Sequence, residues 1–124
     1  MQTAREIAAG YWIAEGKRDT KKVLSFYHED ATFCPPGQKL VGHAQIGGFY
    51  DASSAEFPGL EVEITNDFTV GDQTALEWKA LLTDVTGKEY IVLGVNIVKI
   101  REEKFEWVHS YFDPNILPSE ESNE

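Results

Sequence analysis

Four polar side chains are the candidates for chemistry in this sequence: those of Tyr11, Asn96, His109 and Asp113. His109 and Asp113 lie four residues apart in a stretch with strand-like alternation, so both should point the same way, with Cα atoms about 13 Å apart. Imidazole titrates near neutral pH, and burial in an apolar cavity raises the pKa of a carboxylic acid, so either group could transfer a proton. The alternative is that Asp113 caps the strand end before Pro114 and that His109 is a half-exposed sheet residue.

Tyr11 and Asn96 carry hydrogen-bond donors that could hold a substrate oxygen. Asn96 lies on one face of an otherwise apolar segment, and a buried amide without partners costs roughly 1–3 kcal/mol. Donors aimed at an oxygen that gains negative charge stabilise an enolate, which isomerisation, aldol-type cyclisation and dehydration all require. Tyr11 could instead be a core aromatic whose hydroxyl binds backbone, and Asn96 could be satisfied by a loop or by water.

Aromatic residues make up 12% of the chain, a heavy load for 124 residues. Aromatic side chains fill cores, but they also form the apolar walls of ligand cavities. Most of the candidates could belong to an ordinary core. The residues that we expect to contact a small hydrophobic molecule are Phe26, Phe49, Tyr50, Trp78, Trp107 and Tyr111.

The composition is typical of one globular domain, with 42% hydrophobic and 26% charged residues. We expect the domain to span residues 1–117 and the acidic segment 118–124 to be a disordered tail. The net charge of −10 repels nucleic acid and anionic membrane surfaces, so neither is an expected partner. The chain has no apolar run of about 18 residues and no visible secretory signal, which favours a cytoplasmic location.

No metal or cofactor site is visible in the sequence. The three histidines are scattered, and Cys34 is the single cysteine, so no set of metal ligands has a recognisable spacing. The glycines near position 45 do not follow a strand in the way that a phosphate-binding loop requires. We therefore expect chemistry without a cofactor and without a metal.

Three helices are predicted in the first half of the chain. Thr3 and Glu6 match a capping box that begins a helix, and Gly16 is a plausible end. Asp19 can cap a second helix. A third is expected over about 44–55, after a short strand that ends before Pro35.

Alternation with a period of two predicts four strands in the second half. Within 60–70 the even positions are apolar and should face inward, as should the odd positions of 105–113. The stretch around Trp78 and the stretch 90–100 are the other two strands. Helices followed by such a meander give an α+β fold, in which a curved antiparallel sheet wraps around three helices to form a cone with an internal apolar pocket.

The strand at 90–100 also predicts an interface. If Asn96 faces the interior, the side chains at the odd positions of this strand lie outside, and no helix remains in the sequence to cover them. An exposed apolar patch of this size usually marks an interface, and the same sheet of a second copy is the simplest cover. We therefore predict a homodimer whose interface is centred on Ile91, Leu93, Val95 and Ile97.

The order of elements resembles the nuclear transport factor two-like superfamily, closest to its SnoaL-like polyketide cyclase and ketosteroid isomerase branches. The resemblance covers about Arg5 to Pro114. Its carriers are Tyr11 with Asp19, the run Tyr27–Phe33, the Gly42…Ile46…Phe49-Tyr50 run, and the closing Trp107–Pro114.

The resemblance to the isomerases places Tyr11 at the oxyanion-hole tyrosine and Asn96 at the second oxyanion donor, which in those enzymes is a protonated aspartic acid. Pro35 stands where those enzymes have their catalytic base. Asp113 fits the acid/base aspartate of the SnoaL-like cyclases, and His109 is a candidate for their histidine. In a middle strand, Trp78 and Ala80 replace the arginine and aspartate of limonene epoxide hydrolases.

The sequence therefore predicts a small, cofactor-independent SnoaL-like enzyme that acts on a hydrophobic carbonyl or epoxide compound by isomerase, cyclase or dehydratase chemistry. Pro35 in the position of the base favours the alternative, which is a non-catalytic small-molecule-binding or interaction module of the same fold.

Overall fold

The helices begin and end close to where the sequence predicts them. In the computed structural model, which describes residues 2–118, the Thr3 hydroxyl accepts from the Glu6 backbone N–H and the Glu6 carboxylate accepts from the Thr3 N–H. Asp19 caps the second helix by accepting from the Lys22 N–H. The helices are α1 (Ala4–Gly16), α2 (Thr20–Leu24) and α3 (Gly42–Glu56).

Six strands form a single curved sheet in the order β2-β1-β6-β5-β4-β3. All neighbouring pairs are antiparallel except β1 and β6, which are parallel because β1 precedes the meander and joins its far edge. The strands are β1 (Tyr27–Cys34), β2 (Leu40–Val41), β3 (Gly59–Val70), β4 (Gln73–Thr83), β5 (Glu89–Arg101) and β6 (Lys104–Phe112), and a 3-10 turn follows at Pro114–Ile116.

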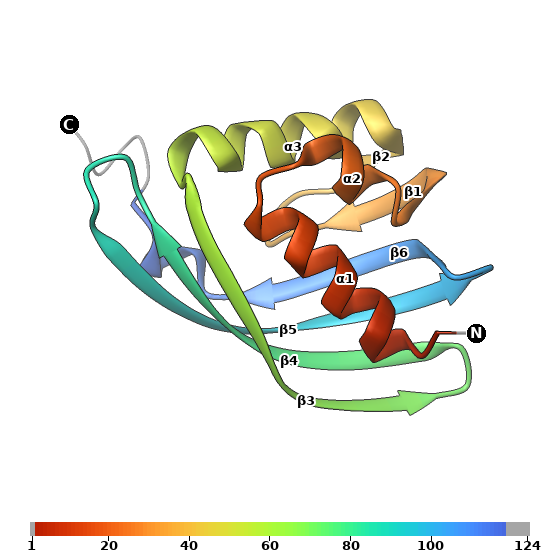
Figure 1. The fold of residues 1–124 in the computed structure, drawn as a ribbon. Coiled ribbons are helices and arrows are strands. Elements are labelled where there is room, and N and C mark those ends of the chain that lie inside the picture. The colour runs from red at the N-terminus through yellow and green to blue at the C-terminus, as the bar shows by residue number, and fades with distance from the viewer. Residues whose placement is uncertain (1, 119–124) are drawn as a thin grey trace.

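All three helices lie on the concave side of the sheet (Figure 1). Helix α1 crosses that side and contacts β3, and α3 runs beside β1. The predicted α+β cone is therefore confirmed. The predicted tail spans residues 118–124, and all of it except Pro118 lies outside the described residues.

Two β-bulges change which side chains face the helices. In β3, Ile64 pairs with Trp78 and Asn66 pairs with Glu77, so Thr65 is an extra residue. A bulge of this kind shifts the alternation by one residue from that point onward. The prediction that Phe68 and Val70 face inward is therefore wrong: they are 60% and 78% exposed.

The second bulge lies in β6, where Phe105 pairs with Ile100 and Trp107 pairs with Lys99. Glu106 is the extra residue, and its carboxylate contacts Lys99 and Arg101 outside the sheet. Phe105 is buried in the core, and beyond the bulge the inward positions are even-numbered. The prediction of a single inward face for the odd positions of 105–113 is therefore wrong.

The alternation of β5 is as predicted. Val92, Asn96 and Val98 are buried beneath the helices, whereas Ile91 is 55% and Leu93 is 65% exposed on the convex side. No helix within residues 2–118 is long and apolar enough to cross a membrane.

Candidate functional site

A cavity of about 610 Å³ lies between the helices and the concave side of the sheet. Helices α1 and α3, the β1–β2 connection and strands β3 to β6 all contribute to its lining. Aromatic side chains form much of the wall, and they are Tyr11, Trp12, Phe33, Phe49, Tyr50, Phe57, Trp78 and Phe112.

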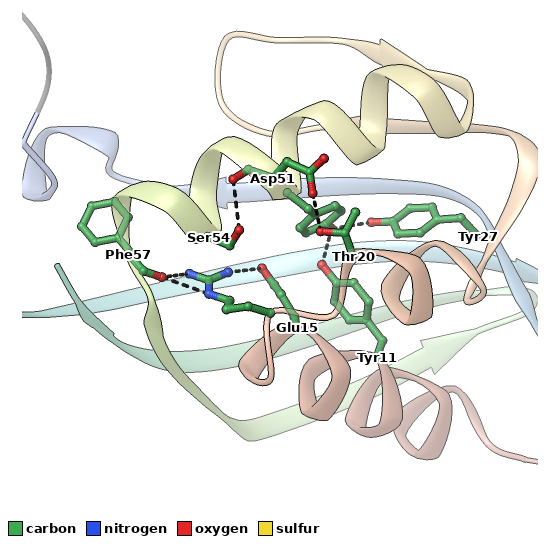
Figure 2. Close-up of polar contacts among 9 residues, drawn as sticks. Tyr11, Glu15, Thr20, Tyr27, Asp51, Ser54 and Phe57 are labelled. Atoms are coloured by element: carbon green, nitrogen blue, oxygen red, sulfur yellow. Dashed lines mark hydrogen bonds and ion pairs between the residues drawn. The ribbon is translucent and has the colours of Figure 1, made fainter. Parts of the chain in front are cut away.

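Three buried tyrosines form a chain of hydroxyl groups that ends at the cavity. The Tyr50 hydroxyl is the central member: it hydrogen-bonds to the Tyr11 hydroxyl and, over 2.8 Å, to the Tyr27 hydroxyl. Figure 2 shows Tyr11 and Tyr27 approaching this point from α1 and β1. Tyr11 and Tyr50 line the cavity, so the Tyr11 hydroxyl can accept from Tyr50 while donating to a ligand.

Burial keeps these tyrosines protonated. Desolvation is the largest influence on all three, and it raises the pKa of Tyr11, Tyr50 and Tyr27 well above the ordinary value. The negative charge of nearby Glu15 raises the pKa of Tyr11 further. The three tyrosine hydroxyls are therefore neutral at physiological pH and can donate hydrogen bonds.

Asn96 presents a second donor from β5. Its Oδ1 accepts a hydrogen bond of 2.9 Å from the indole Nε1 of Trp78 on β4. Within residues 2–118, no group accepts a hydrogen bond from its Nδ2. Every fully buried side-chain nitrogen or oxygen in this range has a hydrogen-bond partner, so the Nδ2 is not fully buried. Asn96 lines the cavity, so its Nδ2 is the free donor on that side.

Glu15 is a cavity residue that the sequence analysis missed. It lies one helical turn after Tyr11 on α1, and its side chain is 14% exposed. Desolvation raises its pKa from 4.5 to about 7, although the positive charge of Arg18 acts in the opposite direction. The spacing of four from Tyr11 is the signal that could have identified it, because residues four apart share a helix face.

Arg18 is anchored to α3 rather than to Glu15. Its guanidinium donates to the backbone oxygen of Phe57 from Nε over 2.9 Å and from Nη2 over 2.5 Å. Its Nη1 lies 4.0 Å from Oε2 of Glu15 (Figure 2). The φ of Arg18 is 55°, in the left-handed region, which is a strained conformation for a residue with a side chain.

The cavity brings together half of the residues predicted from the sequence. Tyr11, Asn96, Trp78, Phe49 and Tyr50 all line it. The prediction for Phe26 is wrong, because its ring packs edge-on against Tyr11 with the Lys22 ammonium above it, and it does not reach the cavity.

The β6 bulge places the remaining aromatic candidates elsewhere. Trp107, His109 and Tyr111 lie on the outer face of the sheet, where the Trp107 and His109 rings stack at 4.5 Å between centroids and Tyr111 is 57% exposed. Ser110 and Phe112 occupy the inward positions instead. The prediction that Trp107, His109 and Tyr111 face the cavity is therefore wrong.

Asp113 is exposed, and its carboxylate accepts from the Asn115 N–H over 3.0 Å as the cap of the 3-10 turn. It is absent from the cavity lining, although its neighbour Pro114 is present. This placement matches the capping alternative rather than a position beside a substrate. Within residues 2–118, no group of three or more histidine, cysteine or acidic side chains could hold a metal ion.

Comparison with known proteins identifies the family. The model of the SnoaL-like domain matches residues 8–108. None of the curated proteins matches the chain.

Solved structures show the same fold at low sequence identity. A protein with a ketosteroid isomerase-like fold from Catenulispora acidiphila DSM 44928, in complex with trimethylamine, is 19% identical over 90% of this chain and 88% of that chain, with a TM-score of 0.80. TerC, co-crystallised with polyporic acid, is 20% identical over 90% and 92%, with a TM-score of 0.79. A candidate SnoaL-like polyketide cyclase from Shewanella denitrificans OS-217 is 18% identical over 90% and 91%, with a TM-score of 0.78.

Proposed function

Because this chain belongs to the SnoaL-like domain family, we propose that it is a cofactor-independent enzyme that binds a small hydrophobic carbonyl compound in its cavity and stabilises the enolate. The observation that carries the proposal is the pair of donors in one apolar cavity: the Tyr11 hydroxyl and the Asn96 amide. Preorganised donors are worth most in a site that excludes water.

Each donor is held by a partner on its far side. Tyr50 can donate to Tyr11, and Trp78 donates to Asn96, so both donors keep their orientation when no ligand is bound. A carbonyl oxygen between them would gain negative charge as the enolate forms, and the two hydrogen bonds would strengthen without rearrangement.

The charges around the cavity disfavour an anionic ligand. Glu15 and Glu56 line it, whereas none of its lining residues within 2–118 is lysine, arginine or histidine. A carboxylate ligand would find no opposite charge there. Two proteins of the same fold were solved with organic molecules, trimethylamine and polyporic acid, which supports binding of a small organic molecule here.

The test uses two probes of similar shape, 4-nitrophenol and 4-nitrotoluene, which share a nitro group and of which only the first carries a phenolic oxygen; a mildly acidic buffer keeps 4-nitrophenol neutral. We expect the protein to bind 4-nitrophenol more tightly by isothermal titration calorimetry. The variants Asn96→Leu and Tyr11→Phe should each reduce the ratio of the two affinities about tenfold. This corresponds to roughly 1.4 kcal/mol for one hydrogen bond. The control is Tyr111→Phe, which removes a hydroxyl outside the cavity. Equal affinity for both probes in the unmodified protein would refute the proposal.

We also propose that two copies pair through the convex side of the sheet. Leu93 and Ile91 on β5 are exposed there, and Val95 pairs with Tyr111 of β6, so the apolar surface is continuous across two strands. The helices cover only the other side (Figure 1). A two-fold axis would bring this surface against itself, with Ile97 beside the same patch.

A further inference from the structure

Within residues 2–118, Glu15 is the one acidic side chain enclosed by the cavity. The other carboxylate in the lining belongs to Glu56, which is exposed at the end of α3, whereas the Glu15 side chain is 14% exposed and lies one turn from Tyr11. Glu15 therefore shares the cavity with the two donors that face a substrate oxygen.

The contacts of Arg18 leave the Glu15 carboxylate available. Two of the guanidinium nitrogens are occupied by the Phe57 carbonyl, and the third approaches Oε2 only to 4.0 Å. A carboxylate in a bidentate ion pair would be a poor proton acceptor, since both of its oxygens would be engaged.

We propose that Glu15 is the proton-transferring residue of the cavity, and that the substrate is a neutral ketone or enone with an acidic C–H beside its carbonyl group. This inference rests on the proposed function, because Tyr11 and Asn96 must hold the oxygen. The Glu15 carboxylate takes the proton, the C–H electron pair becomes a C=C bond, and the carbonyl π electrons move onto the oxygen. Glu15 then returns the proton to a carbon of the enolate, which gives an isomer without any oxidant or reductant.

The electrostatics of the site suit both steps. The titratable and charged groups around Glu15 are Arg18 and the hydroxyls of Tyr11, Tyr27 and Tyr50, which stay neutral. The charge of Arg18 and hydrogen bonding with the Tyr11 hydroxyl both lower the pKa of Glu15. Burial outweighs both of these influences, so the pKa of about 7 leaves the acid and the carboxylate both populated at neutral pH. A residue with this balance can accept a proton and return it.

The first experiment uses 5-nitrobenzisoxazole, a neutral aromatic probe that reports a base in an apolar cavity. The base removes the ring C–H proton, the N–O bond breaks, and a coloured cyanonitrophenolate is released. We expect the protein to accelerate this elimination, with a rate that rises with pH to a plateau and a midpoint near 7. Glu15→Gln should lose about 100-fold or more, as is typical for removal of a general base, and Glu15→Asp should retain part of the rate. The control is Glu63→Gln, since Glu63 is exposed on β3.

A rate that Glu15→Gln leaves unchanged would overturn the inference. If that variant does not fold by circular dichroism, the carboxyl carbons of the unmodified protein, labelled in glutamate, can be titrated by NMR. We then expect one glutamate to titrate near pH 7, and the absence of such a resonance would refute the assignment. The two proposals fail separately: loss of the preference for 4-nitrophenol contradicts the oxygen-binding role of Tyr11 and Asn96, whereas elimination that is independent of Glu15 contradicts its role as the base.

Discussion

The indole Nε1 of Trp78 and the Oδ1 of Asn96 are joined by a hydrogen bond of 2.9 Å between neighbouring strands at the floor of the cavity. An indole nitrogen can only donate, so it fixes which end of the amide is the acceptor. The Nδ2 donor is thereby directed away from Trp78. Trp78, which the sequence predicts only as part of the apolar wall, therefore also orients the amide of Asn96.

Replacing Trp78 with phenylalanine should therefore affect stability and binding together. The Asn96 oxygen would lose its partner, which costs about 1–3 kcal/mol for a buried acceptor, and the preference for 4-nitrophenol should fall because the amide is free to rotate. Urea unfolding and calorimetry measure the two effects. Trp107→Phe is the matched control, because that indole lies on the outer face; if it reduced binding as much as Trp78→Phe, the assignment of faces in β6 would be wrong.

The central position of Tyr50 predicts an order of effects within the tyrosine chain. Tyr50→Phe removes both hydroxyl contacts and leaves Tyr11 without the donor behind it, whereas Tyr27→Phe removes only the outer one. We expect Tyr50→Phe to cost about 1–3 kcal/mol of stability and to weaken 4-nitrophenol binding more than Tyr27→Phe does. Titration of the two variants side by side checks this; a larger effect of Tyr27→Phe on binding would contradict the chain as described.

Glu15 should make the stability depend on pH. Its pKa is raised to about 7 in the folded protein from the ordinary 4.5, so the folded state binds the proton more tightly than the unfolded state. The resulting stabilisation is complete below about pH 4.5 and is lost as the pH rises through 7. We therefore compare the free energy of unfolding of the unmodified protein with that of Glu15→Gln. The advantage of the unmodified protein should fall by up to about 3 kcal/mol as the pH rises between these limits. Urea unfolding at several pH values measures this difference, and a constant difference would show that the folded pKa is not raised.

Leu93→Glu tests the proposed dimer. A charge at the centre of the convex surface should give monomers or aggregates by sedimentation velocity, whereas the unmodified protein should sediment as a dimer at micromolar concentration. Val70→Glu is the control, because Val70 is at least as exposed but lies at the end of the edge strand β3. A monomeric unmodified protein, or a dimeric Leu93→Glu variant, would rule out this interface.

Local patterns were sufficient to predict the three helices, the five longer strands and the inner face of β5, but not the two-residue strand β2 or the 3-10 turn. The capping residues Thr3 and Asp19 act within a few residues of their partners, so their effect is visible in the sequence. Asn96 was recognisable because an amide in an apolar strand is conspicuous, and its alternation is not interrupted by a bulge.

Features that depend on contacts between distant segments could not be predicted from the sequence. The residue that bulges in β6 is determined by its pairing with β5 and by the contacts of Glu106 with Lys99 and Arg101, none of which the local pattern reveals. One extra residue was enough to exchange His109 for Ser110 on the inward face. Glu15 was missed for a different reason: it reads as an ordinary charged residue near the end of a helix, and its enclosure depends on α3 and the sheet.

The Glu106 bulge has a consequence for how this cavity could change in evolution. Substitution alters one side chain at a time, but a shift in which Glu106 paired with Lys99 as an ordinary strand residue would restore strict alternation in β6 and turn its terminal half over. The stacked Trp107 and His109, now outside, would then face the helices, with His109 opposite Asn96, and Ser110 would leave the cavity. A change in the pairing of one strand would thus give the protein an imidazole on the cavity side of its sheet in a single step.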